Sequence, residues 1–200
     1  MKVQFEKYNP DWLVAFEKTK TDLLSTIGFT SPIIEHIGST SVESLSAKPI
    51  IDILVGLTNE NDLDRVIEPL VKAGYIYYEI YNKDMPYRRL FVKHKPNVQN
   101  LHMASVITAD NEIPRYTEEH KQRLAHVHIL TYNTEHWIRH IAFRDYLRSH
   151  PKVKEEYQHL KEILSAKKWK DGNEYSQAKN NFIKAEEQKA IHWYSDKNNY

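Results

Sequence analysis

A glycine-serine turn followed by a solitary acid is the part of the sequence best suited to chemistry. Gly38 ends a β-branched segment, and three hydroxyl side chains follow it, Ser39, Thr40 and Ser41. Because Gly38 has no Cβ, a ligand can approach the backbone closely there. Amides and hydroxyls at the start of a helix favour a phosphate. Asp52 comes 13 residues after Ser39. That spacing leaves room for a turn and a return strand, so we predict a phosphate-binding turn beside Asp52.

Asp52 lies in an apolar segment, where a carboxylate is costly unless it holds a metal or another cation. Strand alternation places it on the same face as Ile50 and Leu54. We predict that Asp52 is catalytic and binds a divalent metal ion, Mg²⁺ or Mn²⁺. In the plainer alternative, the turn is an ordinary helix cap and Asp52 pairs with Lys48 or an arginine, since short motifs have many false positives.

Three further side chains are candidate metal ligands. His126 and His128 are two residues apart on a predicted strand, so both point to one face. Imidazoles suit zinc, manganese or iron better than magnesium, and with Asp52 they would form a site of two histidines and one carboxylate. Glu79, in a tyrosine-rich segment, is the other candidate. The alternative that the histidines bind phosphate, pair with carboxylates or line a polar cleft stays open.

Basic side chains are the candidate contacts for an anionic ligand. A stripe at helical spacing follows residue 134: His136, His140, Arg144 and Arg148. Guanidinium groups suit phosphates and carboxylates. We predict a catalytic role for Arg144 and phosphate binding by Arg148, Arg88 and Lys48. The alternative for the helix is a solvated face or an ion pair between an arginine and Asp145.

These side chains need a sheet with helices around it. The patterns predict strands over 33–37, 50–55, 75–81, 88–94 and 100–108. They predict helices over 10–27 and 63–73, the second kinked at Pro69, and three more over 134–150, from 151 onward and over 174–194. The expected fold is α+β: a small mixed sheet flanked by helices, with a C-terminal three-helix bundle. We expect an α/β domain over 1–132 and a helical region over 133–200, packed as one compact unit.

Composition excludes several classes of protein. Zero cysteines exclude a disulfide framework, a thiol nucleophile and a cysteine-ligated metal. The 28 Lys and Arg against 27 Asp and Glu give a net charge of +1, which provides no field to gather nucleic acid or an acidic membrane. No apolar run approaches the roughly 18 residues of a membrane helix, and the first residues do not form a signal peptide. We expect a cytoplasmic protein with a small-molecule or nucleotide ligand, and no nucleic-acid or membrane partner.

Several segments together resemble the GrpB family. They are 8–12 (YNPDW), 34–42 (IEHIGSTSV), 47–55 (AKPIIDILV), 86–91 (PYRRLF), 125–129 (AHVHI), 139–148 (RHIAFRDYLR), and Tyr175 with Lys179 and Phe182. The resemblance covers most of the chain and implies the polymerase-β-like fold of the nucleotidyltransferase superfamily. It implies metal-assisted transfer of a nucleotidyl group from an NTP to a small acceptor. Gly38, Ser39 and Thr40 would hold phosphates, Asp52 a divalent ion, and Arg144 and Arg148 would neutralise developing charge.

The sequence departs from the superfamily pattern in two ways. That pattern has two acids two residues apart on one strand and a third on a later strand, whereas here only Asp52 is present. Extra residues also interrupt the family pattern at roughly 94–122. The departures leave three hypotheses: a nucleotidyltransferase, a non-catalytic nucleotide or phospho-ligand binding protein that has lost the second carboxylate, and a metal-dependent hydrolase using Asp52, His126 and His128.

Overall fold

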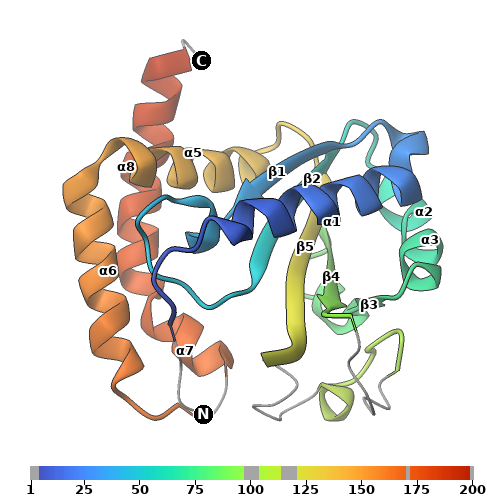
Figure 1. The fold of residues 1–200 in the computed structure, drawn as a ribbon. Coiled ribbons are helices and arrows are strands. Elements are labelled where there is room, and N and C mark those ends of the chain that lie inside the picture. The colour runs from blue at the N-terminus through green and yellow to red at the C-terminus, as the bar shows by residue number, and fades with distance from the viewer. Residues whose placement is uncertain (1–4, 97–103, 114–120, 170–171, 199–200) are drawn as a thin grey trace.

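The chain forms a five-stranded mixed sheet with helices on both faces (Figure 1). The computed structural model describes residues 5–96, 104–113, 121–169 and 172–198. The strands are β1 (Ile33–Ile37), β2 (Ile51–Leu57), β3 (Tyr75–Tyr77), β4 (Arg88–His94) and β5 (Arg123–Thr131). Their order is β1-β2-β5-β4-β3; β2 and β5 run parallel, and the other neighbours are antiparallel. The predicted α+β class is confirmed.

One face of the sheet is covered by helices from the first half of the chain. They are α1 (Asp11–Ile27), which crosses the sheet, and the short α2 (Asp62–Arg65) and α3 (Ile67–Lys72) (Figure 1). Alternation along β2 directs Ile51, Ile53 and Val55 into the core that these helices share with β5. The break between α2 and α3 falls at Val66, three residues before Pro69. It matches the predicted kink, because proline cannot donate to the preceding turn.

The other face of the sheet packs against α5 (Glu135–Ser149). Trp137 and Ile141 of this helix lie on Leu54 of β2 and Leu130 of β5. Trp137 comes so close to Gly56 that a Cβ on that glycine would lie 2.6 Å from the indole Cζ3. The small residue therefore allows α5 to sit directly on the strand.

The remaining helices are α6 (Pro151–Ser165), α7 (Gly172–Ala178) and α8 (Asn180–Asn198). Figure 1 shows α6 and α8 side by side at one end of the sheet, where Tyr157 stacks on Phe182. Four single-turn 3₁₀ helices complete the described elements: η1 (Gly28–Thr30), η2 (Ser39–Ser41), η3 (Glu79–Asn82) and η4 (Asp110–Glu112). In the described part of the chain, none of the helices has the length and apolar character that crossing a bilayer requires.

Three predicted elements differ from the structure. The predicted strand over 75–81 ends at Tyr77, because the chain turns into η3 and packs Tyr78 onto Val92 and Ile107. Within the described part of 100–108, only Val106 forms a bridge, to Tyr77; residues 100–103 lie outside the described residues. The predicted helix over 174–194 is divided into α7 and α8. In each case tertiary packing overrides local propensity.

Candidate functional site

The predicted turn lies directly against Asp52. Gly38 connects β1 to η2 with φ +70° and ψ −174°, a conformation almost restricted to glycine. A Cβ at Gly38 would lie 2.9 Å from the Asp52 Cβ and would overlap its Oδ2. The neighbouring residue, Ile37, pairs with Asp52 across the β1–β2 ladder. The residue type at position 38 thus sets how closely the turn approaches the carboxylate.

Asp52 is held by a chain of hydrogen bonds from β5. His126 is the register partner of Asp52, and its Nδ1 lies 3.2 Å from Oδ1 of that carboxylate. The Arg123 Nη1 lies 3.3 Å from the His126 Nε2. A guanidinium can only donate, so Nε2 accepts and Nδ1 carries the hydrogen given to Asp52. The Asp52 side chain keeps 32% of its surface exposed, so a ligand can reach it.

The carboxylate of Asp52 is ionised at neutral pH. Burial alone would raise its pKa, but the hydrogen bond from His126 and the positive charges around it outweigh burial, so the pKa lies below its ordinary value. Lys179, at the start of α8, is one of these charges. Asp52 therefore presents a fixed negative charge in surroundings that are otherwise positive.

His128 lies on the same face of the sheet as His126, two residues further along β5 and opposite Leu54. Its Nδ1 lies 3.2 Å from Nη1 of Arg88, and its ring centroid is 6.1 Å from that of His140 on α5. Burial lowers the pKa of His128 well below its ordinary value, and the charge of Arg88 lowers it further. Burial, then Arg139 and Arg88, lower the pKa of His140 to about 3. Both imidazoles are neutral, and the Nδ1 of His128 accepts from the arginine.

These side chains do not fit a two-metal centre. Magnesium prefers oxygen ligands, and the same-face neighbour of Asp52 within β2 is Leu54. A histidine nitrogen that accepts from a guanidinium is not offered to a metal, and the adjacent cation repels one. Glu79 is exposed in η3, beyond β3, which is three strands away from β2 in the sheet. Across residues 5–96, 104–113, 121–169 and 172–198, no group of three or more His, Cys, Asp or Glu side chains could hold a metal.

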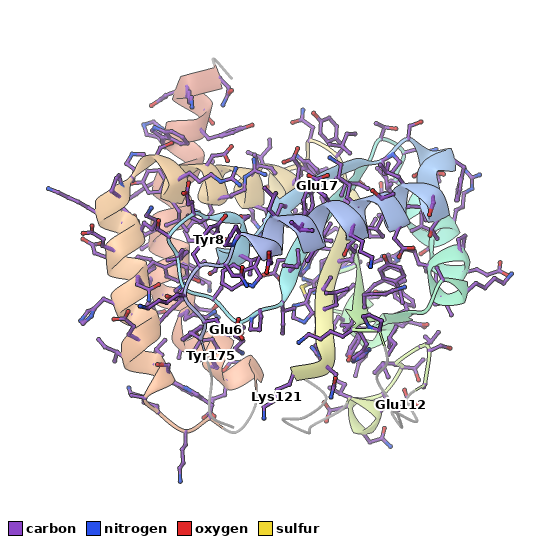
Figure 2. The ribbon with its side chains drawn as sticks, in the orientation of Figure 1. Glu6, Tyr8, Glu17, Glu112, Lys121 and Tyr175 are labelled. Atoms are coloured by element: carbon purple, nitrogen blue, oxygen red, sulfur yellow. The ribbon has the colours of Figure 1, made fainter. Side chains whose placement is uncertain are left out.

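Three lysines lie near Asp52. Of these, only Lys48 was predicted from the sequence to bind phosphate. Lys48, from the loop before β2, and Lys179 place their ammonium nitrogens 4.7 and 4.5 Å from the ring centroid of Tyr175 in α7 (labelled in Figure 2). Lys161 of α6 is 1% exposed and donates to a backbone carbonyl of the same loop. We call Lys48, Lys161 and Lys179 the lysine cluster.

Burial lowers the pKa of all three lysines of the cluster, and repulsion by Lys179 lowers the pKa of the other two further. Burial, then the charge of Lys179, lower the pKa of Lys48 to about 8 and that of Lys161 to about 7. Burial also lowers the pKa of Lys179, while Asp52 opposes the shift. Like charges gathered in a partly desolvated place raise the free energy of the empty site. An anion that enters it would relieve this repulsion.

Tyr175 has a hydroxyl group that no described residue bonds. Its side chain is 2% exposed, and its oxygen lacks a hydrogen-bond partner in the described part of the chain. A buried hydroxyl without a partner costs about 1–3 kcal/mol, which makes such groups rare. The ring that carries this hydroxyl lies against the ammonium groups of Lys48 and Lys179. The hydroxyl could donate to the same anion.

Arg144 and Arg148, two more of the predicted residues, bond to the backbone on either side of the turn. Arg144 donates to Glu35 (2.6 Å), to Asp145 (2.8 Å) and to the carbonyl of His36 (3.1 Å). The predicted alternative of an arginine–Asp145 ion pair is thus present. Arg148 donates to the carbonyl of Ser41 at 2.7 Å.

The hydroxyl groups of the turn are engaged inside the protein. Thr40 Oγ1 lies 3.0 Å from the His36 Nε2, and Ser41 Oγ donates to the Gly38 carbonyl. The Ser39 side chain bonds to Tyr157 of α6. Thr40 and Ser41, with Arg144 and Arg148, line a separate groove outside β1. Of the predicted residues, Gly38, Lys48, His126 and His128 therefore lie around Asp52, with Ser39 next to Gly38, and Arg88 is linked to this group through His128. The other predicted residues line the groove or, like Glu79, lie beyond the far edge of the sheet.

The chain is similar to proteins of known sequence and structure. The family model described as GrpB protein matches residues 2–119 and 109–189. The two matches overlap inside 94–122, where the sequence led us to expect extra residues. The chain is 30% identical over 177 residues to the glutamate-rich protein GrpB of Alkalihalophilus pseudofirmus, covering 88% of each. It is 31% identical over 198 residues to the UPF0157 protein YqkA of Bacillus subtilis, and it spans half the length of that relative.

A solved structure shows the same architecture. The crystal structure of the conserved protein GrpB from Enterococcus faecalis superposes with a TM-score of 0.73 at 30% sequence identity. The superposition covers 96% of this chain and 99% of that one. The family match, the relatives and the shared structure show that the chain belongs to the GrpB family.

Proposed function

We propose that the protein binds a phosphate-bearing ligand of the nucleotide class beside Asp52, without a two-metal centre. The observation that carries this proposal is the lysine cluster. Lys48 and Lys179 both lie over the ring of the buried Tyr175 and interact electrostatically with Asp52, and Arg123 is near Lys48. Charge-assisted hydrogen bonds from such groups are among the strongest that proteins make to phosphates.

The side chains around Asp52 would each contact a different part of the ligand. Lys48, Lys179 and the hydroxyl of Tyr175 would hold phosphate oxygens. Gly38, which lacks a Cβ, lets the ligand pass close to the backbone of the turn. Asp52, held ionised by His126, would accept a hydrogen bond from a hydroxyl or amino group of the ligand. Asp52, whose charge is opposite to that of the lysines, would thereby fix the orientation of the ligand.

A nucleotidyltransferase-like topology is part of the proposal. The Gly-Ser turn precedes Asp52 on the adjoining strand, and α5, α6 and α8 would form a C-terminal helical bundle beside the sheet. The superfamily pattern has a second acid two residues away on the same strand and a third on a later strand. Here Leu54 follows Asp52 on the same face, and the residue that faces Asp52 on β5 is His126. We therefore favour ligand binding over nucleotidyl transfer.

Nucleotidyl transfer remains the second candidate because the Asp52 side chain is partly exposed. One divalent ion on its carboxylate would bridge it to the ligand phosphates and lower their charge. The third hypothesis, a hydrolase that uses Asp52, His126 and His128, has less support. The arginine contacts of both histidines, from Arg123 and Arg88, oppose metal ligation.

Titration calorimetry with ATP, with either EDTA or Mg²⁺ in the buffer, tests the proposal. Replacing Lys179 with alanine removes a charge-assisted contact of about 1.5–3 kcal/mol, so we expect the affinity to fall about 10- to 100-fold. The matched control is Lys152→Ala, an exposed lysine of α6. The binding proposal expects equal affinity in EDTA and in Mg²⁺.

Each outcome of that titration has a clear meaning. If Mg²⁺ raises the affinity and Asp52→Ala abolishes the increase, the second candidate replaces the first. If Lys179→Ala and Lys152→Ala bind ATP equally well, the lysine cluster is not the phosphate site. If neither ATP nor pyrophosphate binds at millimolar concentration, the proposed function is wrong.

A further inference from the structure

A hollow lies outside β1, apart from Asp52 and the lysine cluster. It is a groove of about 620 Å³ between α1 on one side and α5 with the start of α6 on the other. Ile34, Glu35 and His36 of β1 form its floor, and Tyr8, labelled in Figure 2 near the start of α1, lies along it. The turn η2 separates this groove from Asp52.

The floor of the groove is the edge of the sheet. β1 is the terminal strand in the order β1-β2-β5-β4-β3, with β2 as its neighbour among the described strands. A terminal strand has backbone N–H and C=O groups that face away from the sheet, and these groups can pair with another extended chain. Arg144 already donates to one of them, the carbonyl of His36. Ile34, Glu35 and His36 all line the groove, so a ligand in the groove would lie along this edge.

The walls of the groove carry positive charge. Lys20 projects from α1, and Arg148 and Lys154 project from α5 and α6. Within the described residues, neither Lys20 nor Lys154 forms an ion pair with a carboxylate. Of the two lining carboxylates, Glu35 is paired with Arg144, and Glu43 is exposed. The groove is therefore complementary to an acidic partner.

An apolar rim adjoins these charges. On α1, Leu13 and Val14 are 52% and 67% exposed, and Leu13 also lines the groove. Exposed apolar side chains beside a charged groove are typical of protein interaction sites. An extended segment has alternating side chains, so it could direct some to this rim and others to the lysines.

We infer that this groove binds an extended acidic peptide segment of a partner protein, which adds to β1 as a sixth strand. The backbone of the segment pairs with the outer edge of β1, its carboxylates meet Lys20, Arg148 and Lys154, and an apolar side chain covers Leu13. The five residues of β1 extend over roughly 17 Å, which suits a segment of about four to six residues. This site goes beyond the proposed function, because Asp52 and the lysine cluster take no part in it.

The test uses a fluorescent peptide, acetyl-Glu-Val-Glu-Val-Glu-Val-amide, and measures its anisotropy with the whole protein. The variant Lys20→Glu/Lys154→Glu reverses two charges in the groove. The variant Lys18→Glu/Lys152→Glu reverses two exposed charges on the same two helices outside it. We expect the first variant to weaken binding at least 10-fold and the second to stay within twofold of the wild type. Circular dichroism checks that both variants are folded.

Two further measurements separate strand pairing from charge attraction. Methylating alternate amide nitrogens of the peptide, in both registers, removes backbone donors while keeping every side chain. We expect at least one of these peptides to lose binding, and the amide resonances of Ile34 and His36 to shift with the unmodified peptide. Equal losses in both double variants, full binding by both methylated peptides, or no binding at millimolar concentration would overturn the inference. Free glutamate that saturates the same resonances would show a small-ligand pocket and would also overturn it.

Discussion

Replacing Gly38 with alanine tests the contact between the turn and Asp52. The structure gives two separate reasons for a loss of stability. The backbone of Gly38, at φ +70° and ψ −174°, is strained for any residue with a Cβ. The new methyl group would also meet Asp52, whose Cβ lies 2.9 Å from its position. The carboxylate would have to turn away from His126.

The two effects give an order of magnitude for the loss. The backbone strain costs about 1–3 kcal/mol. Losing the hydrogen bond from His126 to the ionised Asp52 costs about 1.5–3 kcal/mol. The surroundings relax in part, so we expect the free energy of unfolding to fall by about 3–5 kcal/mol in total. Urea unfolding followed by circular dichroism measures it, with the slope of the transition checked for constancy.

Two other glycines are matched controls for this experiment. A methyl group on Gly28 would have no atom within 4 Å, and the backbone there has an ordinary helical φ of −58°, so alanine should change stability by less than about 1 kcal/mol. Gly74 has φ +80°, but its nearest neighbour is the flexible end of Lys93 at 3.8 Å, so alanine should cost about 1–2 kcal/mol from the backbone alone. The excess loss at Gly38 measures the contact with Asp52. Equal losses at Gly38 and Gly74 would refute the reasoning.

Three more predictions follow from the packing and the charges. Gly56→Ala should cost about 1–3 kcal/mol in urea unfolding, because its methyl group would overlap Trp137; unchanged stability would contradict the seating of α5 on β2. Tyr175→Phe removes a hydroxyl without a described partner, so stability should stay constant or rise by up to about 1 kcal/mol while ATP affinity falls in calorimetry; a loss of stability, or unchanged affinity, would count against the site. Burial lowers the pKa of His36 to about 4, so the unfolded chain takes up a proton below about pH 6.5 that the folded chain does not, and stability should fall by at most about 3 kcal/mol as the pH drops from 6.5 to 4. His36→Gln, which keeps a polar partner for Thr40, should make that fall shallower, and an identical pH profile would rule out this role for His36.

Short-range sequence patterns were enough to predict strands that carry the site. The bounds of β1 and β4 agree with the predicted strands, because β-branched and alternating segments depend on short-range preferences. Strand alternation also placed His126 and His128 on one face, and the β2–β5 register shows that Asp52 shares this face. A period of two residues is sufficient for that inference.

The lysine cluster could not be predicted in the same way. Lys161 and Lys179 lie more than 100 residues after Lys48 in the chain, and each looks like an ordinary surface lysine in its own helix. Only the packing of α6, α7 and α8 beside the loop before β2 brings their charges together. The sequence signals that pointed here were Lys48, named for phosphate binding, and the resemblance of Tyr175 and Lys179 to the family tail.

Arg144 and Glu79 show the same dependence on packing. The helical stripe containing Arg144 is real, but whether that arginine meets a ligand or Glu35 depends on where α5 crosses β1. Glu79 follows a strand that takes the far edge of the sheet, and strand order is not visible in the order of elements along the chain. Long-range arrangement therefore determined which of the predicted residues reach Asp52.

A crystal of the protein grown with tungstate, a phosphate-like anion visible by its anomalous scattering, tests the central claim most directly. Our account predicts a peak within hydrogen-bonding distance of the ammonium groups of Lys48 and Lys179 and of the Tyr175 hydroxyl. A peak found only elsewhere, or no peak at a concentration that saturates binding in solution, would contradict it.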